Sequence, residues 1–293
     1  MMEFKVMTFP DMAHVYRLRE ALWRDTPFGN AGVMVGSGFS RNADPTSPGS
    51  RTMPTWQELT LSLVDRLYIN PDQQAQRESA IRESGATSGF LRLAQEFEAA
   101  FGRTTLNGLI RDLVPDMDYS PGDLHRLLLE LPWADVLTTN WDTLLERAST
   151  DIFNRNYQIV RSLSEIPNNK RPRIVKLHGS LPANDPFIFT EEDYRTYQTR
   201  FAPFVNLVRQ SMMENVICLL GFSGDDPNFL HWSGWARDHL DMLTQKIYLV
   251  GWLDLSTHRR RMLEDRHVIP IDLAHLPVGQ KWPVGQHHRY ATE

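Results

Sequence analysis

The stretch Gly32-Val33-Met34-Val35-Gly36-Ser37-Gly38-Phe39-Ser40 decides the fold, because in it a short apolar run passes directly into glycines. The run at 32–35 is typical of a buried strand. Gly36 and Gly38 then fall where a backbone turning from strand to helix can approach a phosphate closely. A dinucleotide fingerprint would add a third glycine and, about 20 positions later, an acidic residue, and neither is evident. Without a following Lys-Ser or Lys-Thr, the stretch is not a phosphate P-loop either.

Five further apolar runs follow, and amphipathic segments alternate with them, which is the pattern of a doubly wound α/β protein. The six predicted strands are residues 32–35, 135–138, 174–177, 216–220, 247–250 and 268–271. The predicted helices are residues 55–68, 90–101, 124–131, 141–148, 201–213, 227–240 and 257–266. The first two strands are about 100 residues apart, against about 30 in an ordinary βαβ unit. We therefore expect a Rossmann-like, mostly parallel sheet with a helical insert, at about residues 55–131, between the first and second strands.

Composition limits the function and the domain organisation. The 293 residues carry 31 Lys plus Arg and 36 Asp plus Glu, so the formal charge of -5 argues against direct nucleic-acid binding. The single cysteine, Cys218, excludes an intramolecular disulfide and a four-cysteine zinc site. With no signal peptide and no apolar stretch of about 18 residues, we expect a cytoplasmic protein without a membrane partner. We assign residues 1–275 to one domain and residues 276–293 to a C-terminal tail.

Polar motifs follow three of the later predicted strands. The second ends in Thr139-Asn140-Trp141-Asp142, the third in Leu177-His178-Gly179-Ser180, and the fourth in Gly221-Phe222-Ser223-Gly224-Asp225. Each motif alone has a structural explanation, as a helix cap, a strand-end histidine or a tight turn. Their coincidence favours function, because the carboxyl ends of parallel strands meet at the edge where doubly wound folds bind ligands.

These motifs, together with Gly36-Ser37-Gly38-Phe39-Ser40, resemble in order and spacing the sirtuin (silent information regulator) superfamily over about residues 30–275. Three further segments are similar to its bacterial branch: Met53-Pro54-Thr55-Trp56, which resembles a cofactor loop, His125 with Leu128 and Leu131, and Thr190-Glu191-Glu192-Asp193-Tyr194. Sirtuin deacylases carry a four-cysteine zinc module that one cysteine cannot supply. The resemblance therefore implies the zinc-free antiphage-defence branch, whose members hydrolyse NAD, and makes lysine deacylation doubtful.

The resemblance implies an NAD+ nucleosidase that cleaves the nicotinamide–ribose bond to nicotinamide and ADP-ribose, depleting NAD in abortive infection. This cleavage builds positive charge on the ribose, so the site needs polar groups around the sugar more than a strong nucleophile. By resemblance, Asn140 orients the ribose and the attacking water. Asp142 lies near the nicotinamide carboxamide or braces the loop. His178 bonds a ribose hydroxyl or acts as general base, since its reference pKa of about 6.5 is near working pH.

The same resemblance implies which residues bind the dinucleotide. They are Gly36, Ser37, Gly38 and Ser40 along the pyrophosphate, Gly221, Ser223 and Asp225 on the adenosine side, and Trp56, Thr139 and Phe222 elsewhere in the cleft.

Three other interpretations stay open. A serine hydrolase would use Ser223 in a nucleophile elbow, although Asp225 stands where that motif has glycine. A metalloenzyme is disfavoured because the ten histidines lack His-Glu-x-x-His spacing. A module that senses NAD or an ADP-ribose derivative without cleaving it is disfavoured by the presence of both Asn140 and His178.

Control of the activity is expected from outside the catalytic core. An unrestrained NAD hydrolase would drain its own cell, and after the last predicted strand only about 20 residues remain, too few for a sensor domain. We expect a homo-oligomer in which the helical insert closes the cleft, or a partner subunit that shifts the cleft toward an open state. The resemblance suggests a DNA-translocase-type ATPase or an Argonaute-like protein as that partner.

Overall fold

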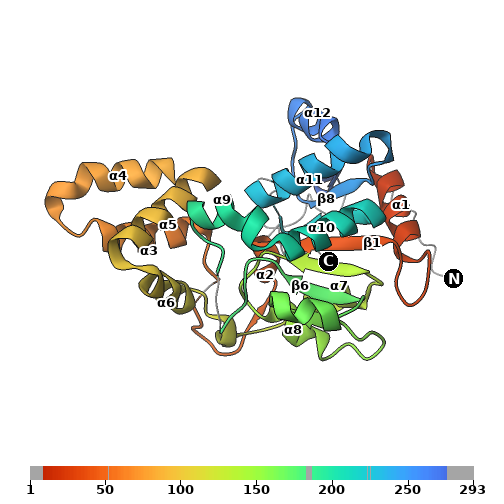
Figure 1. Ribbon diagram of the computed structural model, residues 1–293, viewed down its shortest axis with the longest axis horizontal. Helices are drawn as coiled ribbons and strands as arrows, with labels where there is room; N and C mark the ends of the chain where they lie inside the picture. Colours follow the sequence, from red (N-terminus) through yellow and green to blue (C-terminus); the bar gives the residue numbers. More distant parts are fainter. Residues whose placement is uncertain (1–8, 52, 183–186, 223, 225, 276–293) are drawn as a thin grey trace.

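The computed structural model describes residues 9–51, 53–182, 187–222, 224 and 226–275, and its centre is a parallel sheet of seven strands (Figure 1). The strand order is β5-β6-β4-β1-β7-β8-β9, and every neighbouring pair is parallel. The strands are β1 (Ala31–Val35), β4 (Asp135–Thr138), β5 (Gln158–Val160), β6 (Arg173–Lys176), β7 (Val216–Leu220), β8 (Ile247–Gly251) and β9 (Val268–Asp272). The doubly wound prediction is confirmed. Strand β5 was not predicted, since three residues of which one is fully buried make no apolar run.

The register brings the strand ends to one level. Val35 at the end of β1 pairs with Thr138 of β4 and with Leu220 of β7, while Thr138 pairs with Lys176 of β6. From β1 the chain first builds the sheet outward through β4, and it later returns to β7 on the other side of β1. The loops that leave the central strands therefore meet beside the point where the winding reverses, which is the usual ligand position in such sheets.

Helices cover both faces of the sheet. They are α1 (Met12–Leu22), α2 (Ser37–Ser40), α7 (Asp123–Glu130), α8 (Leu144–Ser149), α9 (Glu191–Arg200), α10 (Ala202–Glu214), α11 (Pro227–Leu240) and α12 (Thr257–Asp265). Met34 faces a core built with α10 and α11, whereas Val33 and Val35 face a core built with α1, α7 and α8. This alternation is the two-residue period of a strand, and because both faces are covered, β1 is apolar throughout.

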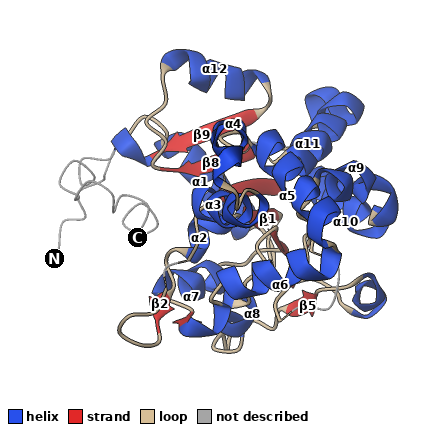
Figure 2. Cartoon of the chain, turned by 90° about the vertical axis from the view of Figure 1, so that its left-hand side faces the viewer, coloured by secondary structure: helices blue, strands red, loops and turns tan. Residues whose placement is uncertain are grey.

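The predicted helical insert between the first two strands is present as a separate helical lobe, seen on the left of Figure 1 and nearest the viewer in Figure 2. Its helices are α3 (Trp56–Leu67), α4 (Gln74–Glu83), α5 (Thr87–Phe101) and α6 (Arg103–Leu113). Leu63, Phe97 and Ile110 belong to an apolar core that the insert shares with Leu144 and Phe189. Two two-residue strands, β2 (Asp44–Pro45) and β3 (Tyr119–Ser120), pair antiparallel at its base. Helix α7, predicted at 124–131 inside the insert range, packs instead on the sheet.

Some helix predictions were incomplete or displaced. Helices α1, α4, α6 and α9 were missed; α4, for example, buries no side chain and so has no apolar period to detect. The helix predicted at 141–148 begins at Leu144, because the Asp142 carboxylate accepts a hydrogen bond from the Leu144 amide at 3.2 Å. The predicted tail at residues 276–293 lies outside the described residues. In the part of the chain that the structure describes, no helix has the length and apolarity needed to cross a membrane.

Candidate active site

The loops after β1, β4, β6 and β7 bring the predicted motifs to one edge of the sheet. The β1 loop enters α2 directly, and the β7 loop lies against it: the Gly36 amide donates to the Leu220 carbonyl and the Gly38 amide to the Gly221 carbonyl, both at 3.0 Å. Motifs more than 180 residues apart in sequence thus form one surface.

Glycine is required where these two loops touch. A Cβ on Gly36 would lie 2.4 Å from the Gly221 carbonyl oxygen, and a Cβ on Gly221 would lie 2.3 Å from the Phe39 nitrogen. Gly221 also has φ +59°, which disfavours other residues. Loop packing is therefore sufficient to explain why glycine occupies these two positions, whether or not a phosphate also approaches them.

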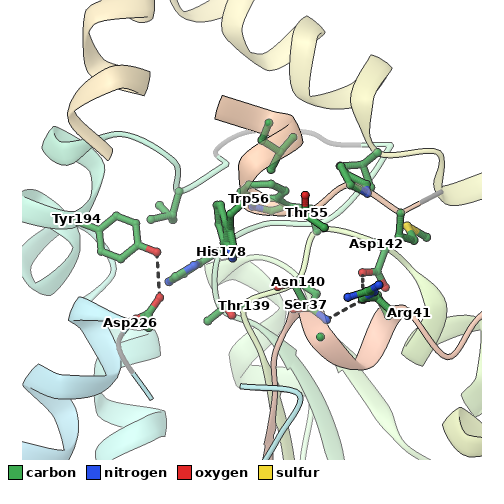
Figure 3. Close-up of a pocket in the computed structure, with 18 residues that line it drawn as sticks. Ser37, Arg41, Thr55, Trp56, Thr139, Asn140, Asp142, His178, Tyr194 and Asp226 are labelled. Carbon is green, nitrogen blue, oxygen red and sulfur yellow. Dashed lines mark hydrogen bonds between the residues drawn. The ribbon is translucent and has the colours of Figure 1, made fainter. Parts of the chain in front are cut away.

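Two adjoining cavities, of about 240 and 340 Å³, open along this surface, and we call them cavity 1 and cavity 2. Both are lined by Ser37, Gly38, Trp56, Thr139, Tyr194 and Asp226. Cavity 1 (Figure 3) is completed by Ser40, Asn140, Asp142 and His178, among others. Cavity 2 reaches Gly36, Gly221, Phe222 and the insert. Because they share walls, the cavities make one cleft between the sheet edge and the insert.

Asn140 is held rigidly at the wall of cavity 1. Its side-chain Nδ2 donates to the Gly36 carbonyl at 2.9 Å and to Ser40 Oγ at 3.0 Å, and its backbone amide donates to Thr138 Oγ1 at 3.1 Å. The side-chain oxygen Oδ1 is buried and has no hydrogen-bond partner. A fixed, unpartnered acceptor beside a cavity indicates a group that is completed by a ligand.

Asp142 and Ser40 brace this arrangement. Ser40 Oγ donates to Asp142 Oδ2 at 2.6 Å, and the other carboxylate oxygen is used by the start of α8. Lys176, buried with Glu146, donates from Nζ to the Asp142 carbonyl. Of the two roles considered for Asp142, the geometry favours bracing the loop. The Ser40 hydroxyl, predicted at the pyrophosphate, is engaged within the protein.

His178 follows β6 and is 2% exposed. Burial lowers its pKa from the ordinary value of 6.5, while the Asp226 and Asp193 carboxylates act in the opposite direction. Its Nε2 lies 3.2 Å from the side-chain Nδ2 of Asn228, a residue in the first turn of α11. The ring of Tyr194 packs edge-on against it, with centroids 5.3 Å apart. The imidazole is therefore neutral at physiological pH and fixed in orientation.

Tyr194 and Asp226 were missed as site residues. The Tyr194 hydroxyl donates to Asp226 Oδ2 at 2.9 Å, and both side chains point into the cleft beside His178 (Figure 3). Burial and the Asp226 carboxylate raise the pKa of Tyr194 well above its ordinary value. Asp226 also caps α11 by accepting from the Phe229 amide at 3.0 Å. Two features of the sequence could have identified them: the motif at residues 190–194, which ends in Tyr194, and the acidic turn after β7.

Trp56, which the resemblance assigned to a cofactor loop, lines both cavities. Helix α3 starts beside the cleft because the Thr55 side chain accepts from the Glu58 amide while Glu58 accepts from the Thr55 amide. The Trp56 ring is 50% exposed and packs edge-on against Phe90 at 4.8 Å between centroids. Arg41, which sequence analysis did not select, is the one cationic side chain lining cavity 1 in the described part of the chain.

Two predicted contacts, Ser223 and Asp225, lie outside the described residues. The structure therefore tests neither these two adenosine-side contacts nor the serine-hydrolase alternative. Among the residues that are described, no group of three or more His, Cys, Asp or Glu side chains is arranged to hold a metal ion. Cys218 is buried in the core under α7 and α8, and burial raises the pKa of its thiol to about 12. That the protein contains no zinc remains a prediction, which metal analysis would test.

Comparison with known proteins connects this geometry to a family. Residues 134–271 match the SIR2-like domain. The NAD(+) hydrolase ThsA of Acinetobacter baumannii (strain 532279) is 26% identical over 229 residues, which cover 75% of this chain and 42% of that relative. Defense-associated sirtuin 2 of Bacillus subtilis is 22% identical over 207 residues, covering 69% of this chain and 19% of that relative. These matches confirm the resemblance to the sirtuin superfamily.

The chain spans less than half the length of these relatives. A solved structure described as "Structural Basis for the Mechanism and Regulation of Sir2 Enzymes" is similar with a TM-score of 0.38 and 12% identity, over 83% of this chain and 86% of that one.

Proposed function

We propose that this chain, whose residues 134–271 match the SIR2-like domain, hydrolyses NAD+ to nicotinamide and ADP-ribose in the cleft between its sheet and its insert. Relatives named NAD(+) hydrolase and Defense-associated sirtuin support both the substrate and a role in antiphage defence. NAD is a substrate in this proposal and no metal takes part.

The reaction breaks the bond between the nicotinamide nitrogen and ribose C1′. The bonding electron pair goes to the nicotinamide ring and neutralises its pyridinium charge, while positive charge builds on the ribose. A water oxygen then bonds to C1′ and the water loses a proton to solvent. Because the charge appears on the sugar before water attacks, a correctly placed acceptor stabilises the transition state more than a strong base would.

The unpartnered Oδ1 of Asn140 carries this proposal. Because two hydrogen bonds already fix the Asn140 amide, no free energy is needed to reorient its oxygen when charge develops near it. It can accept from the attacking water or from a ribose hydroxyl. We place the nicotinamide riboside in cavity 1, next to Asn140 and His178, and the rest of the dinucleotide toward cavity 2. Arg41, at the wall of cavity 1, supplies positive charge for a phosphate.

The experiment is to incubate the pure protein with NAD+ and quantify free nicotinamide and ADP-ribose by chromatography, with His178→Ala as the matched inactive variant. We expect equimolar products and a loss of at least about 100-fold in rate for His178→Ala. If the wild-type protein bound NAD+ tightly but released no nicotinamide, hydrolysis would be contradicted. The alternative of a module that senses NAD without cleaving it would then remain. A loss confined to KM in His178→Ala would move His178 from catalysis to binding.

We also propose that assembly controls the activity. Arg103 of the insert pairs with Asp193 of α9 at 2.8 Å, and Asp116 accepts hydrogen bonds from Thr143. Polar contacts thus attach the insert beside the cleft, in addition to the apolar packing that it shares with the rest of the chain. Assembly into a homo-oligomer, or binding of a partner such as a DNA-translocase-type ATPase or an Argonaute-like protein, would shift the position of the insert relative to the sheet. That shift would change the access of NAD+ to the cleft.

A further inference from the structure

The amide of Asn228 contacts the catalytic histidine from a buried position. Asn228 is 2% exposed, and its Nδ2 lies 3.2 Å from His178 Nε2. On its other side, Asn228 Oδ1 accepts a hydrogen bond from Gln198 Nε2 of α9 at 3.3 Å. In the structure the Asn228 amide thus turns its oxygen toward Gln198 and its NH2 group toward the imidazole.

This orientation has one chemical consequence. An amide NH2 group donates hydrogen bonds and cannot accept them, so His178 Nε2 must be the acceptor. A neutral imidazole carries one hydrogen, which must then reside on Nδ1. The ring is neutral because burial lowers its pKa. Among the described residues the His178 ring forms its one hydrogen bond at Nε2, and the side chain lines cavity 1.

We infer that Asn228 is a positioning residue that fixes His178 as the Nδ1–H tautomer, so that His178 meets the substrate as a hydrogen-bond donor. The catalytic part of this inference rests on the proposed NAD+ hydrolysis. A ribose hydroxyl oxygen is the acceptor available in that reaction. With its Nε2 lone pair occupied by Asn228, His178 takes no proton from the attacking water, which agrees with a reaction in which bond breaking leads.

The tautomer can be measured without activity. Long-range proton–nitrogen correlation on protein with 15N-labelled histidine distinguishes a ring nitrogen that carries hydrogen from one that does not, and a His178→Gln sample assigns the signals. We expect hydrogen on Nδ1 and a bare Nε2 in the wild-type protein at neutral pH. Hydrogen on Nε2 with a bare Nδ1 would overturn the inference, whether or not the protein cleaves NAD+.

Asn228→Asp supplies the second arm. Its carboxylate is similar in shape but only accepts, so it draws hydrogen onto Nε2. We expect this variant to fold, to show a protonated Nε2, and to lose about 100-fold in kcat/KM for NAD+. Asn215→Asp is the control, since Asn215 is equally buried but precedes β7 at the opposite end of the sheet. Wild-type kcat/KM in a folded Asn228→Asp protein would refute the positioning role.

Discussion

Replacing Asn140 by alanine removes two hydrogen bonds of known geometry and one unpartnered acceptor. The variant loses the Nδ2 hydrogen bonds to the Gly36 carbonyl and to Ser40 Oγ, and it loses the buried Oδ1 acceptor. It keeps the backbone bond to Thr138 Oγ1 and the Ser40–Asp142 hydrogen bond. The β4 loop therefore retains its course while the wall of cavity 1 loses its polar centre.

The expected magnitudes separate folding from catalysis. At about 1 kcal/mol for each neutral hydrogen bond, the two Nδ2 bonds contribute about 2 kcal/mol to the free energy of unfolding. For a protein of this size that loss lowers Tm by several degrees, which leaves the protein folded at 25 °C. Removing a preorganised group that stabilises transition-state charge costs about 10²–10³ in kcat. The catalytic loss thus far exceeds what partial unfolding would produce.

The assay measures nicotinamide release and thermal unfolding on the same preparations. Asn215→Ala is the matched control, because Asn215 is 3% exposed and its Nδ2 bonds Ser211 Oγ at 3.2 Å, away from the cleft. We expect both variants to lose stability and only Asn140→Ala to lose turnover. Near wild-type turnover by folded Asn140→Ala would refute the mechanism, and equal losses of turnover in both variants would attribute the effect to instability.

Three other predictions follow from the remaining features. Burial lowers the pKa of His125 from 6.5 to about 4, with the Asp142 and Asp44 carboxylates opposing and Arg126 and Arg147 reinforcing the shift. The unfolded chain thus binds a proton that the folded chain does not, so about 3 kcal/mol of stability, fully present above pH 6.5, is lost as pH falls to about 4. The free energy of unfolding, measured with urea at each pH across this range, should fall in the wild-type protein but not in His125→Leu. An equal dependence of that free energy on pH in the two proteins would contradict the prediction. Metal analysis should find no stoichiometric zinc; one tightly held zinc per chain would overturn this. Light scattering gives the oligomeric state of the purified protein, and the nicotinamide assay gives its activity. We expect low activity, held down by self-assembly or by the lack of a partner, and a fully active monomer would disprove such control.

The sequence by itself determined the sheet and the edge at which the site lies. Strands such as β1 and β7 are apolar over their whole length, since both faces of the sheet are covered, and this local pattern can be recognised from the sequence alone. The position of Asn140 and His178 just past strand ends then placed them at a common edge, because parallel strands all end on the same side. The elements that were not predicted also have a local explanation. Strand β5 and helix α4 bury too few side chains to produce a periodic pattern of apolar residues.

Only the tertiary structure decided how the side chains at that edge are used. The fit of Gly36 against Gly221, the hydrogen bond from Tyr194 to Asp226 and the contact of Asn228 with His178 each join segments between 30 and 190 residues apart. Such contacts depend on the height and tilt at which whole helices pack, which no local pattern encodes. A strand end brings a polar residue to a cleft, but the neighbours that approach from other elements determine which of its atoms remains free for a ligand.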